Sequence, residues 1–279
     1  MTRTRVIAAL ILTPIAIAAI LLLPTPWMMA LAAIVFLGGL WEWFRLADIE
    51  DTLARSVLLV VNLGLMVAIV WSSRTSQGFS YVLLQLMTVI GVAWWLLALL
   101  WLRQFEFRAD HGATHARVFK LAAGTLAIVP AWCALGVLHG SEPNGHRWLF
   151  VALAIVWAAD SGAYFAGRHY GKRKLSPRIS PNKTIEGLVG GLLCGLAVAL
   201  AFAPMAGASL GQLPLVGLAA VAAVLFSVVG DLFESLLKRH VGAKDSGDLI
   251  PGHGGVLDRI DGVLAALPVF ALGKAWLGF

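Results

Sequence analysis

The chain has 279 residues, of which 59% are hydrophobic and only 13% are charged, and its formal net charge is +6. Soluble domains carry about 25% charged residues, so this composition excludes an ordinary soluble protein and predicts a polytopic membrane protein. The positive charge does not indicate nucleic-acid binding, because the chain offers no soluble basic domain. Cys133 and Cys194 are isolated in apolar segments without the spacing of a zinc or redox site, so we interpret both as small core residues.

About nine apolar windows are long enough to cross a bilayer, since a helical span needs roughly 20 mainly apolar residues. The sequence therefore predicts an all-α transmembrane protein, with five spans in residues 1–140 and the functional chemistry in residues 141–279. The first window resembles a secretory signal, but it lacks a polar cleavage region and is interpreted as a retained helix. The predicted spans are 6–23, 27–46, 55–72, 81–102, 119–138, 148–167, 185–206, 211–237 and 259–278.

The Lys and Arg residues are divided unequally between the two sides of the membrane that these windows imply. With the N-terminus in the cytoplasm, all but three of the 21 fall on the cytoplasmic side, and Arg74, Arg147 and Lys274 fall on the other. Cytoplasmic loops of membrane proteins carry an excess of these residues. We therefore predict a cytoplasmic N-terminus and a C-terminus on the opposite side.

The first five windows show no convincing catalytic chemistry. The second ends in Trp41, Glu42, Trp43, Phe44 and Arg45, and its aromatic residues resemble the belt that membrane helices place at the interface. We interpret Glu42 as a neutralised or paired boundary residue rather than as a ligand.

The sixth window is interrupted by Asp160 and Ser161. An ionisable residue within a span is costly and normally faces a polar cavity, so it indicates function; a structural hydrogen bond between helices is the alternative. Asp160 precedes Arg168 by eight residues, which is about 12 Å along a helix. We therefore place Asp160 in the cytoplasmic half of the span.

A basic loop joins the sixth and seventh windows. Ser-Pro pairs at 176–177 and 180–181 break any helix there, and Thr184 is suited to begin the next one. Lys183 lies close to this helix start. The cations of the loop are typical either of a cytoplasmic membrane loop or of a phosphate-binding segment.

The seventh window has a glycine at every fourth position, Gly187, Gly191 and Gly195. This small-xxx-small pattern allows helices to approach closely. The close packing could lie within one chain or between two, so a homodimer is one of the two alternatives. No P-loop pattern is present in the sequence.

The densest group of charges lies at the end of the eighth window and the start of the ninth. Asp231, Glu234 and Lys238 lie close together at helical spacing, and Asp258 and Asp261 begin the ninth window from the same side. Carboxylates suit magnesium, and cationic side chains pair with phosphate groups. The sequence thus predicts a magnesium and nucleotide triphosphate site near the cytoplasmic face.

Residues 235–261, SLLKRHVGAKDSGDLIPGHGGVLDRID, resemble the signature of the phosphatidate cytidylyltransferases, also called CDP-diacylglycerol synthases. The stretches WAADSGAYFAGR and ISPNKTIEG are also similar to family sequence, so the resemblance covers roughly the C-terminal half. It implies a nucleotidyltransferase of phospholipid biosynthesis that converts CTP and phosphatidic acid into CDP-diacylglycerol and pyrophosphate. It also implies one or two magnesium ions, a bacterial inner membrane, and a site that faces the cytoplasm.

The resemblance assigns roles to individual residues. Asp231 and Asp258 would be the principal metal ligands, with Asp160 and Asp261 completing the metal and nucleotide site. The residues expected to act most directly in catalysis are Asp231, Asp258, Lys183, Lys238 and Arg239. The residues expected to bind substrate are Asp160, Ser161, Glu234, Lys244, Asp245, His253 and Arg259. The cations that would hold phosphates are Lys183, Lys238, Arg239, Lys244 and Arg259.

The reaction itself requires charge neutralisation and alignment more than a strong base, because an anionic phosphate oxygen attacks a phosphorus atom of CTP. Phosphatidate is already largely ionised near neutral pH, so we predict that His253 is not an essential proton acceptor. A transporter that uses Asp160, Asp231 and Asp258 as an ion relay is the main alternative. Transporters, however, place such groups near the midplane and often show internal repeats, and none is visible here.

Among lipid enzymes, the CDP-alcohol phosphotransferases also use carboxylates in the membrane. Their DGxxAR pattern is missing from this sequence, since Asp261-Gly262-Val263 begins similarly and then departs from it. A purely structural membrane protein would not need so many acidic residues near the bilayer.

Overall fold

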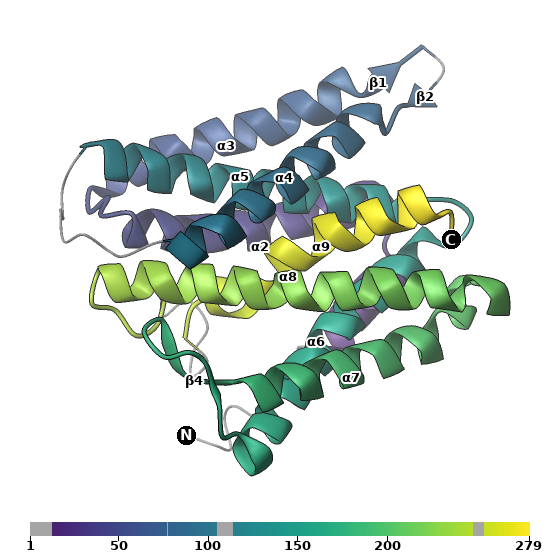
Figure 1. Cartoon of the computed structure of the whole chain (residues 1–279). Coiled ribbons are helices and arrows are strands. Elements are labelled where there is room, and N and C mark those ends of the chain that lie inside the picture. Colours follow the sequence, from purple (N-terminus) through teal and green to yellow (C-terminus); the bar gives the residue numbers. More distant parts are fainter. Residues whose placement is uncertain (1–12, 77, 105–113, 248–253) are drawn as a thin grey trace.

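The computed structural model describes residues 13–76, 78–104, 114–247 and 254–279. These residues form a bundle of long helices, eight of which are long and apolar enough to cross a membrane (Figure 1). The prediction of an all-α, polytopic transmembrane fold is therefore confirmed. A shorter apolar helix over Thr13–Leu22 precedes them, and residues 6–12 of the first predicted window, 6–23, lie outside the described residues.

The eight long helices follow the remaining predicted windows to within a few residues. Their bounds are α2 Thr25–Leu46, α3 Thr52–Ser72, α4 Val82–Gln104, α5 Thr114–His139, α6 Gly145–Tyr170, α7 Ile185–Phe202, α8 Leu213–His240 and α9 Leu257–Leu277. Two short 3-10 helices, η1 Pro204–Ala206 and η2 Leu210–Gln212, connect α7 to α8.

The structure adds two small antiparallel sheets that the sequence did not predict. Strands β1 (Arg74–Thr75) and β2 (Gly78–Phe79) pair between α3 and α4. Strands β3 (Lys174–Ser176) and β4 (Ser180–Thr184) pair within the basic loop between α6 and α7. This β3–β4 hairpin lies near the C-terminal end of α8 (Figure 1), and it contributes to the site described below.

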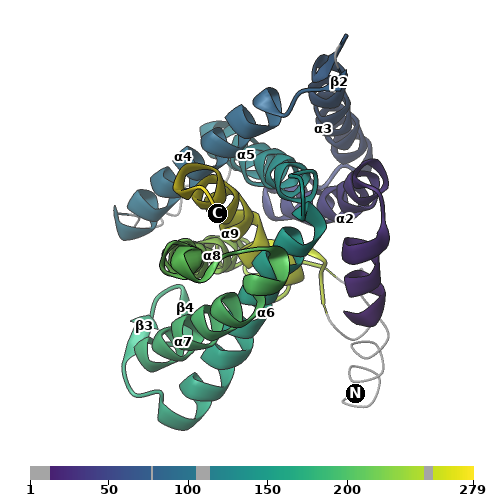
Figure 2. The ribbon, with the colours of Figure 1, turned by 90° about the vertical axis from the view of Figure 1, so that its right-hand side faces the viewer.

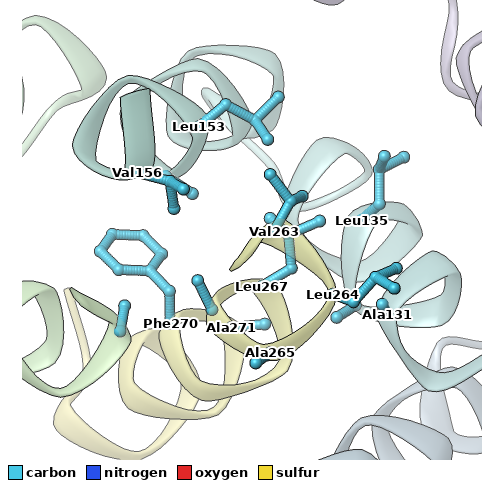
Figure 3. Close-up of a cluster of buried hydrophobic side chains, with 14 of the residues drawn as sticks. Ala131, Leu135, Leu153, Val156, Val263, Leu264, Ala265, Leu267, Phe270 and Ala271 are labelled. Atoms are coloured by element: carbon cyan, nitrogen blue, oxygen red, sulfur yellow. The ribbon is translucent and has the colours of Figure 1, made fainter. Parts of the chain in front are cut away.

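Helix α9 lies at the centre of the bundle, where it packs against α2, α4, α5, α6 and α8 (Figure 2). Leu264, Leu267 and Phe270 of α9 are fully buried and meet side chains of α5 and α6, among them Leu135 and Val156 (Figure 3). In a bilayer, close packing rather than water exclusion holds helices together. The start of α9, with its two aspartates, is therefore fixed by contacts on several sides.

The glycine pattern of α7 packs within the chain. A Cβ atom added to Gly191 would lie 2.9 Å from the carbonyl oxygen of Ala159, and one added to Gly187 would lie 3.0 Å from that of Ala163. Both carbonyls belong to α6. Of the two alternatives that the sequence left open, these glycines therefore serve the packing of α6 against α7 in one chain.

The aromatic residues at the end of α2 do not form an interfacial belt as a group. Trp43 and Phe44 are each only 1% exposed, so that interpretation is wrong for both. Trp43 stacks on Phe233 of α8, with 5.8 Å between ring centroids, and its Nε1–H donates to the carbonyl of Lys120 at 2.8 Å. The end of α2 therefore lies inside the protein, next to the charged end of α8.

Candidate active site

A cavity of about 680 Å³ lies between α6, α7, α8 and α9, next to the β3–β4 hairpin. Its wall includes Ala163, Leu188 and Val228, which make part of it apolar. The charged residues predicted for the site that line this cavity are Asp160, Lys183, Asp231, Asp258, Arg259 and Asp261. A cavity that combines charged and apolar walls suits a ligand with a phosphate group and a lipid portion.

An ion pair joins the hairpin to α8 within this cavity. Lys183 of β4 lies with its Nζ 2.5 Å from Oδ2 of Asp231. The two side chains are 23% and 37% exposed, so both charges remain accessible to a ligand. Asp231 also accepts a hydrogen bond from the hydroxyl of Ser235, one turn later, at 3.3 Å.

The hairpin that carries Lys183 is fixed at its base by the start of α7. The carboxylate of Glu186 accepts the backbone N–H groups of Lys172 and Arg173 at 3.0 and 3.1 Å. Thr184 caps α7, since its hydroxyl oxygen accepts the N–H of Gly187 at 3.1 Å. These contacts limit the positions that Lys183 can take.

Asp258, in the first turn of α9, is surrounded by donors. Its Oδ1 lies 2.7 Å from Nζ of Lys238, and its Oδ2 accepts the backbone N–H groups of Ser246 at 3.0 Å and Gly255 at 2.9 Å. Lys238 also lies 2.5 Å from the carboxylate of Glu234, one turn earlier in α8. Lys238 thus bridges two carboxylates and holds the start of α9 against α8.

Two further carboxylates approach the same cavity from different helices. Asp160 of α6 is exposed toward the cavity and lies within electrostatic range of Asp231 and Arg259. Asp261 of α9 is half-buried near Asp231, and its Oδ1 accepts the N–H of Gly262 at 2.7 Å. Like charges that lie this close together favour the binding of cations between them.

The close approach of α8 and α9 depends on Gly230. A Cβ atom at this position would overlap the carbonyl oxygen of Asp261 and would lie 3.1 Å from Cβ of Ala265. Because Gly230 has no side chain, the neighbouring Asp231 is brought close to the first turns of α9.

Comparison with known proteins shows the family of this chain. The model of the cytidylyltransferase family matches residues 3–275. The chain belongs to the cytidylyltransferase family. It is 41% identical over 272 residues to the phosphatidate cytidylyltransferase of Pseudomonas aeruginosa, a match that covers 97% of this chain and 96% of that protein. The predicted family resemblance is therefore confirmed.

The chain is also similar to phosphatidate cytidylyltransferases of two other bacteria. It is 38% identical over 284 residues to the phosphatidate cytidylyltransferase of Haemophilus influenzae, with 97% of this chain and 98% of that protein covered. It is 47% identical over 135 residues to the phosphatidate cytidylyltransferase of Bacillus subtilis, with 47% of this chain and 48% of that protein covered.

Several residues predicted for the site lie outside the cavity wall of this cytidylyltransferase family member. Lys238 and Glu234 lie behind Asp258, where they form the ion pairs described above. Ser161 is exposed, and its hydroxyl donates to the carbonyl of Trp157 at 2.9 Å. These placements favour a supporting role for Lys238 and Glu234 over direct contact with substrate.

The remaining predicted residues lie at the end of α8 and in the segment between α8 and α9. Arg239, Lys244 and Asp245 are exposed, and Nε of Arg239 donates to the carbonyl of Ile179 in the hairpin at 3.5 Å. They do not line the cavity. His253 lies outside the described residues, so its predicted role stays a prediction.

The sequence analysis missed part of the cavity wall and the contacts behind it. Tyr164, Arg168 and Asn182 line the cavity, and none of the three was among the predicted site residues. Arg168 had been considered only as one of the cations of the basic loop, whose role was left open between a membrane loop and a phosphate-binding segment. Glu42 and Arg45 of α2 contact the segment that precedes α9, as described below. The signal for Arg168 and Asn182 was their position within the two upstream stretches that resemble the family.

The carboxylates can be tested for their fit to a divalent cation. Within the described ranges, no three His, Cys, Asp or Glu side chains are close enough together to hold a metal ion by themselves. Magnesium that acts on nucleotides is usually held by only one or two carboxylates together with substrate phosphates. Asp231 and Asp258 fit this requirement because they line one cavity from adjacent helices, and Asp231 is the more exposed of the two, at 37% against 11%.

Proposed function

We propose that this protein is a phosphatidate cytidylyltransferase that transfers the cytidylyl group of CTP to phosphatidic acid. The observation that carries the proposal is the single cavity that joins four aspartates with Lys183, Arg168 and Arg259 and also has an apolar wall. The family to which the chain belongs and the names of its near full-length relatives support the same reaction.

The reaction forms one phosphorus–oxygen bond and breaks another. A phosphate oxygen of phosphatidate attacks the α-phosphorus of CTP, the bond from that phosphorus to the oxygen that bridges it to the β-phosphorus breaks, and pyrophosphate leaves with the electron pair. The attacking oxygen is already ionised, so the main task of the protein is to neutralise charge and align the two phosphates. Lys183 and Arg259 are placed to bind phosphate oxygens, because both line the cavity.

We further propose that the enzyme depends on magnesium, in one or two ions. Asp231 and Asp258 would be the principal ligands, and Asp160 and Asp261 would support them. A bound magnesium ion would supply positive charge to the phosphates of the nucleotide. Lys183 would then hold Asp231 in place when no substrate is bound and would be free to pair with a phosphate when substrate enters.

The protein would lie in the inner membrane of a bacterium, and its cavity would face the cytoplasm. The distribution of Lys and Arg residues supports this orientation, and the relatives are bacterial. CTP would reach the cavity from water, while phosphatidate would enter sideways from the cytoplasmic leaflet. A homodimer is also proposed; it would use a surface other than the α7 glycines, which pack against α6.

The first experiment measures conversion of phosphatidate to CDP-diacylglycerol by the purified protein in detergent, with CTP and with or without magnesium. We expect magnesium-dependent product and a loss of at least about 100-fold in turnover in Asp231→Asn, since a misplaced phosphate group costs this much. Glu50→Gln is the matched control, because Glu50 is an exposed carboxylate that does not line the cavity.

Two results would contradict the proposal. Binding of CTP without product would indicate a different acceptor lipid. A folded protein that binds no CTP would instead favour an ion transporter that uses the same carboxylates.

A further inference from the structure

Glu42 is a buried carboxylate far from the predicted site residues in the sequence. It lies near the C-terminal end of α2 and is only 2% exposed. A buried charge is costly unless its oxygens are fully paired. The hydrogen-bond partners of Glu42 therefore indicate its structural role.

Among the described residues, the hydrogen bonds of this carboxylate come from the start of α9 and from Ser246 in the segment before it. Its Oε2 accepts the N–H of Leu257 at 2.8 Å and the hydroxyl of Ser246 at 2.9 Å. Its Oε1 accepts the N–H of Val256 at 3.1 Å. Every one of these partners is a donor, which matches an ionised carboxylate.

Glu42 supplies the N-terminal cap that α9 lacks. The residue at the cap position is Val256, and its own side chain accepts no hydrogen bond from the first turn. The free N–H groups of a helix start need acceptors, and negative charge is favourable there. A carboxylate from α2, 215 residues away from Leu257, meets both needs.

The same contacts lead directly to Asp258. The hydroxyl of Ser246, which donates to Glu42, accepts the N–H of Asp258 at 3.3 Å, and the N–H of Ser246 donates to the Asp258 carboxylate at 3.0 Å. Arg45, one turn after Glu42, donates to the carbonyl oxygen of Ser246 at 2.5 Å. The end of α2 thus holds both sides of Ser246.

Two glycines make room for this arrangement. Cβ atoms added to Gly247 or Gly255 would overlap the carboxylate of Glu42. Neither glycine has a positive φ angle, so backbone conformation does not explain them. The absence of a side chain at these positions allows the two segments to close around Glu42.

We propose that Glu42 is a positioning residue for the reaction, which fixes the segment before α9 and thereby the carboxylate of Asp258. This inference rests on the proposed function for its kinetic consequence, but its structural consequence can be measured independently. Glu42 does not line the cavity and would not touch substrate. It acts through Ser246 and through the first turn of α9.

The test is Glu42→Gln, assayed for turnover, for KM of CTP and for amide hydrogen exchange. Glutamine keeps the shape but replaces one acceptor oxygen with a donor that faces the N–H groups of α9. We expect kcat to fall by about 10- to 100-fold, because small misplacements of a catalytic group have this effect. We expect KM for CTP to change by less than about threefold, and the amides of residues 254–258 to exchange at least about tenfold faster.

The matched control is Asp51→Asn. Asp51 caps α3 by accepting the N–H of Leu53, it is exposed, and its side chain makes no hydrogen bond to the described residues of the segment before α9. The control should keep wild-type kinetics and exchange. Unchanged exchange at residues 254–258 and unchanged kcat in Glu42→Gln would overturn the proposal.

Ser246→Ala provides a second variant if Glu42→Gln folds poorly. It removes the hydroxyl that joins Glu42 to the N–H of Asp258. If both residues act through one contact, the double variant loses no more kcat than the worse single variant. Independent losses that multiply would contradict the proposal. If the wild-type protein made no product, the proposed function would fail, while the exchange measurement would still decide whether Glu42 fixes this segment.

Discussion

The structure contains two lysine–aspartate ion pairs of similar length. Replacing the lysine by methionine is predicted to lower mainly the stability in one pair and mainly the turnover in the other. Lys238 lies 2.7 Å from Asp258 and 2.5 Å from Glu234, and the side chains of these three residues are 15%, 11% and 1% exposed. Lys183 lies 2.5 Å from Asp231 in the cavity, where the side chains are 23% and 37% exposed. The comparison separates a structural role from a role in binding phosphate.

Lys238→Met leaves two buried carboxylates close together without a cation between them. Removal of one partner from a buried ion pair costs about 3–5 kcal/mol of stability, since it leaves an uncompensated charge. For a protein of this size that loss lowers the midpoint of thermal unfolding by about 10 °C. Lys183→Met breaks a more exposed pair and should cost at most about 1 kcal/mol.

The effects on turnover should be in the reverse order, with the larger loss in Lys183→Met. Lys183→Met should lose about 100-fold or more in kcat with almost unchanged thermal stability, because it removes a cation that binds phosphate. The double variant Glu234→Gln/Lys238→Met should recover part of the stability that Lys238→Met loses, since one of the two carboxylates becomes neutral.

The assay is thermal unfolding of the purified variants in one detergent, together with CDP-diacylglycerol formation. Wild-type stability in Lys238→Met, combined with a large loss of CTP affinity, would refute the reasoning. That result would mean that Lys238 binds phosphate directly, as the sequence had predicted, and that the ion pairs of the substrate-free structure are dispensable.

The remaining predictions concern one contact between helices and one side chain. Gly230→Ala should destabilise the protein by about 1–3 kcal/mol and reduce turnover, because its Cβ would overlap the Asp261 carbonyl. The control Gly64→Ala, whose Cβ would meet no atom within 4 Å, should be neutral or stabilising by up to about 1 kcal/mol. Both variants are measured by thermal unfolding and product formation. His253→Gln should keep wild-type kcat, and a loss of the chemical step with intact CTP binding would contradict this.

The helices could be predicted from the sequence because their signal is local. Runs of apolar residues of membrane-spanning length located the eight long helices. They do not show where a helix ends when its last residues are polar. Helix α8 continues to His240, three residues beyond the predicted end of its window, since the backbone hydrogen bonds of its last turn do not depend on apolar side chains. The β3–β4 hairpin was missed because its segment has no alternating apolar pattern.

The location of the candidate site could also be predicted, since charged residues in an apolar chain are costly and indicate functional positions. The partners of each charge could not be assigned in the same way. Lys238 was predicted to hold phosphate, yet its spacing of four residues from Glu234 already favours an ion pair along α8. Local spacing thus predicts the ion pair, and the role of Lys238 toward phosphate stays a prediction.

Glu42 shows why the rest of the site could not be found from sequence patterns. Rules for helix starts search for a capping side chain within the few residues before the helix, and the cap residue of α9, Val256, has no side-chain cap hydrogen bond. Its acceptor comes from α2, and only the packing of α9 at the centre of the bundle brings the two together. The division into residues 1–140 and 141–279 therefore describes where the signature lies. The contacts that fix Asp258 nevertheless join the two parts. A charge buried in the N-terminal half is stable only because the C-terminal half supplies its donors, so the two halves need each other to complete the site.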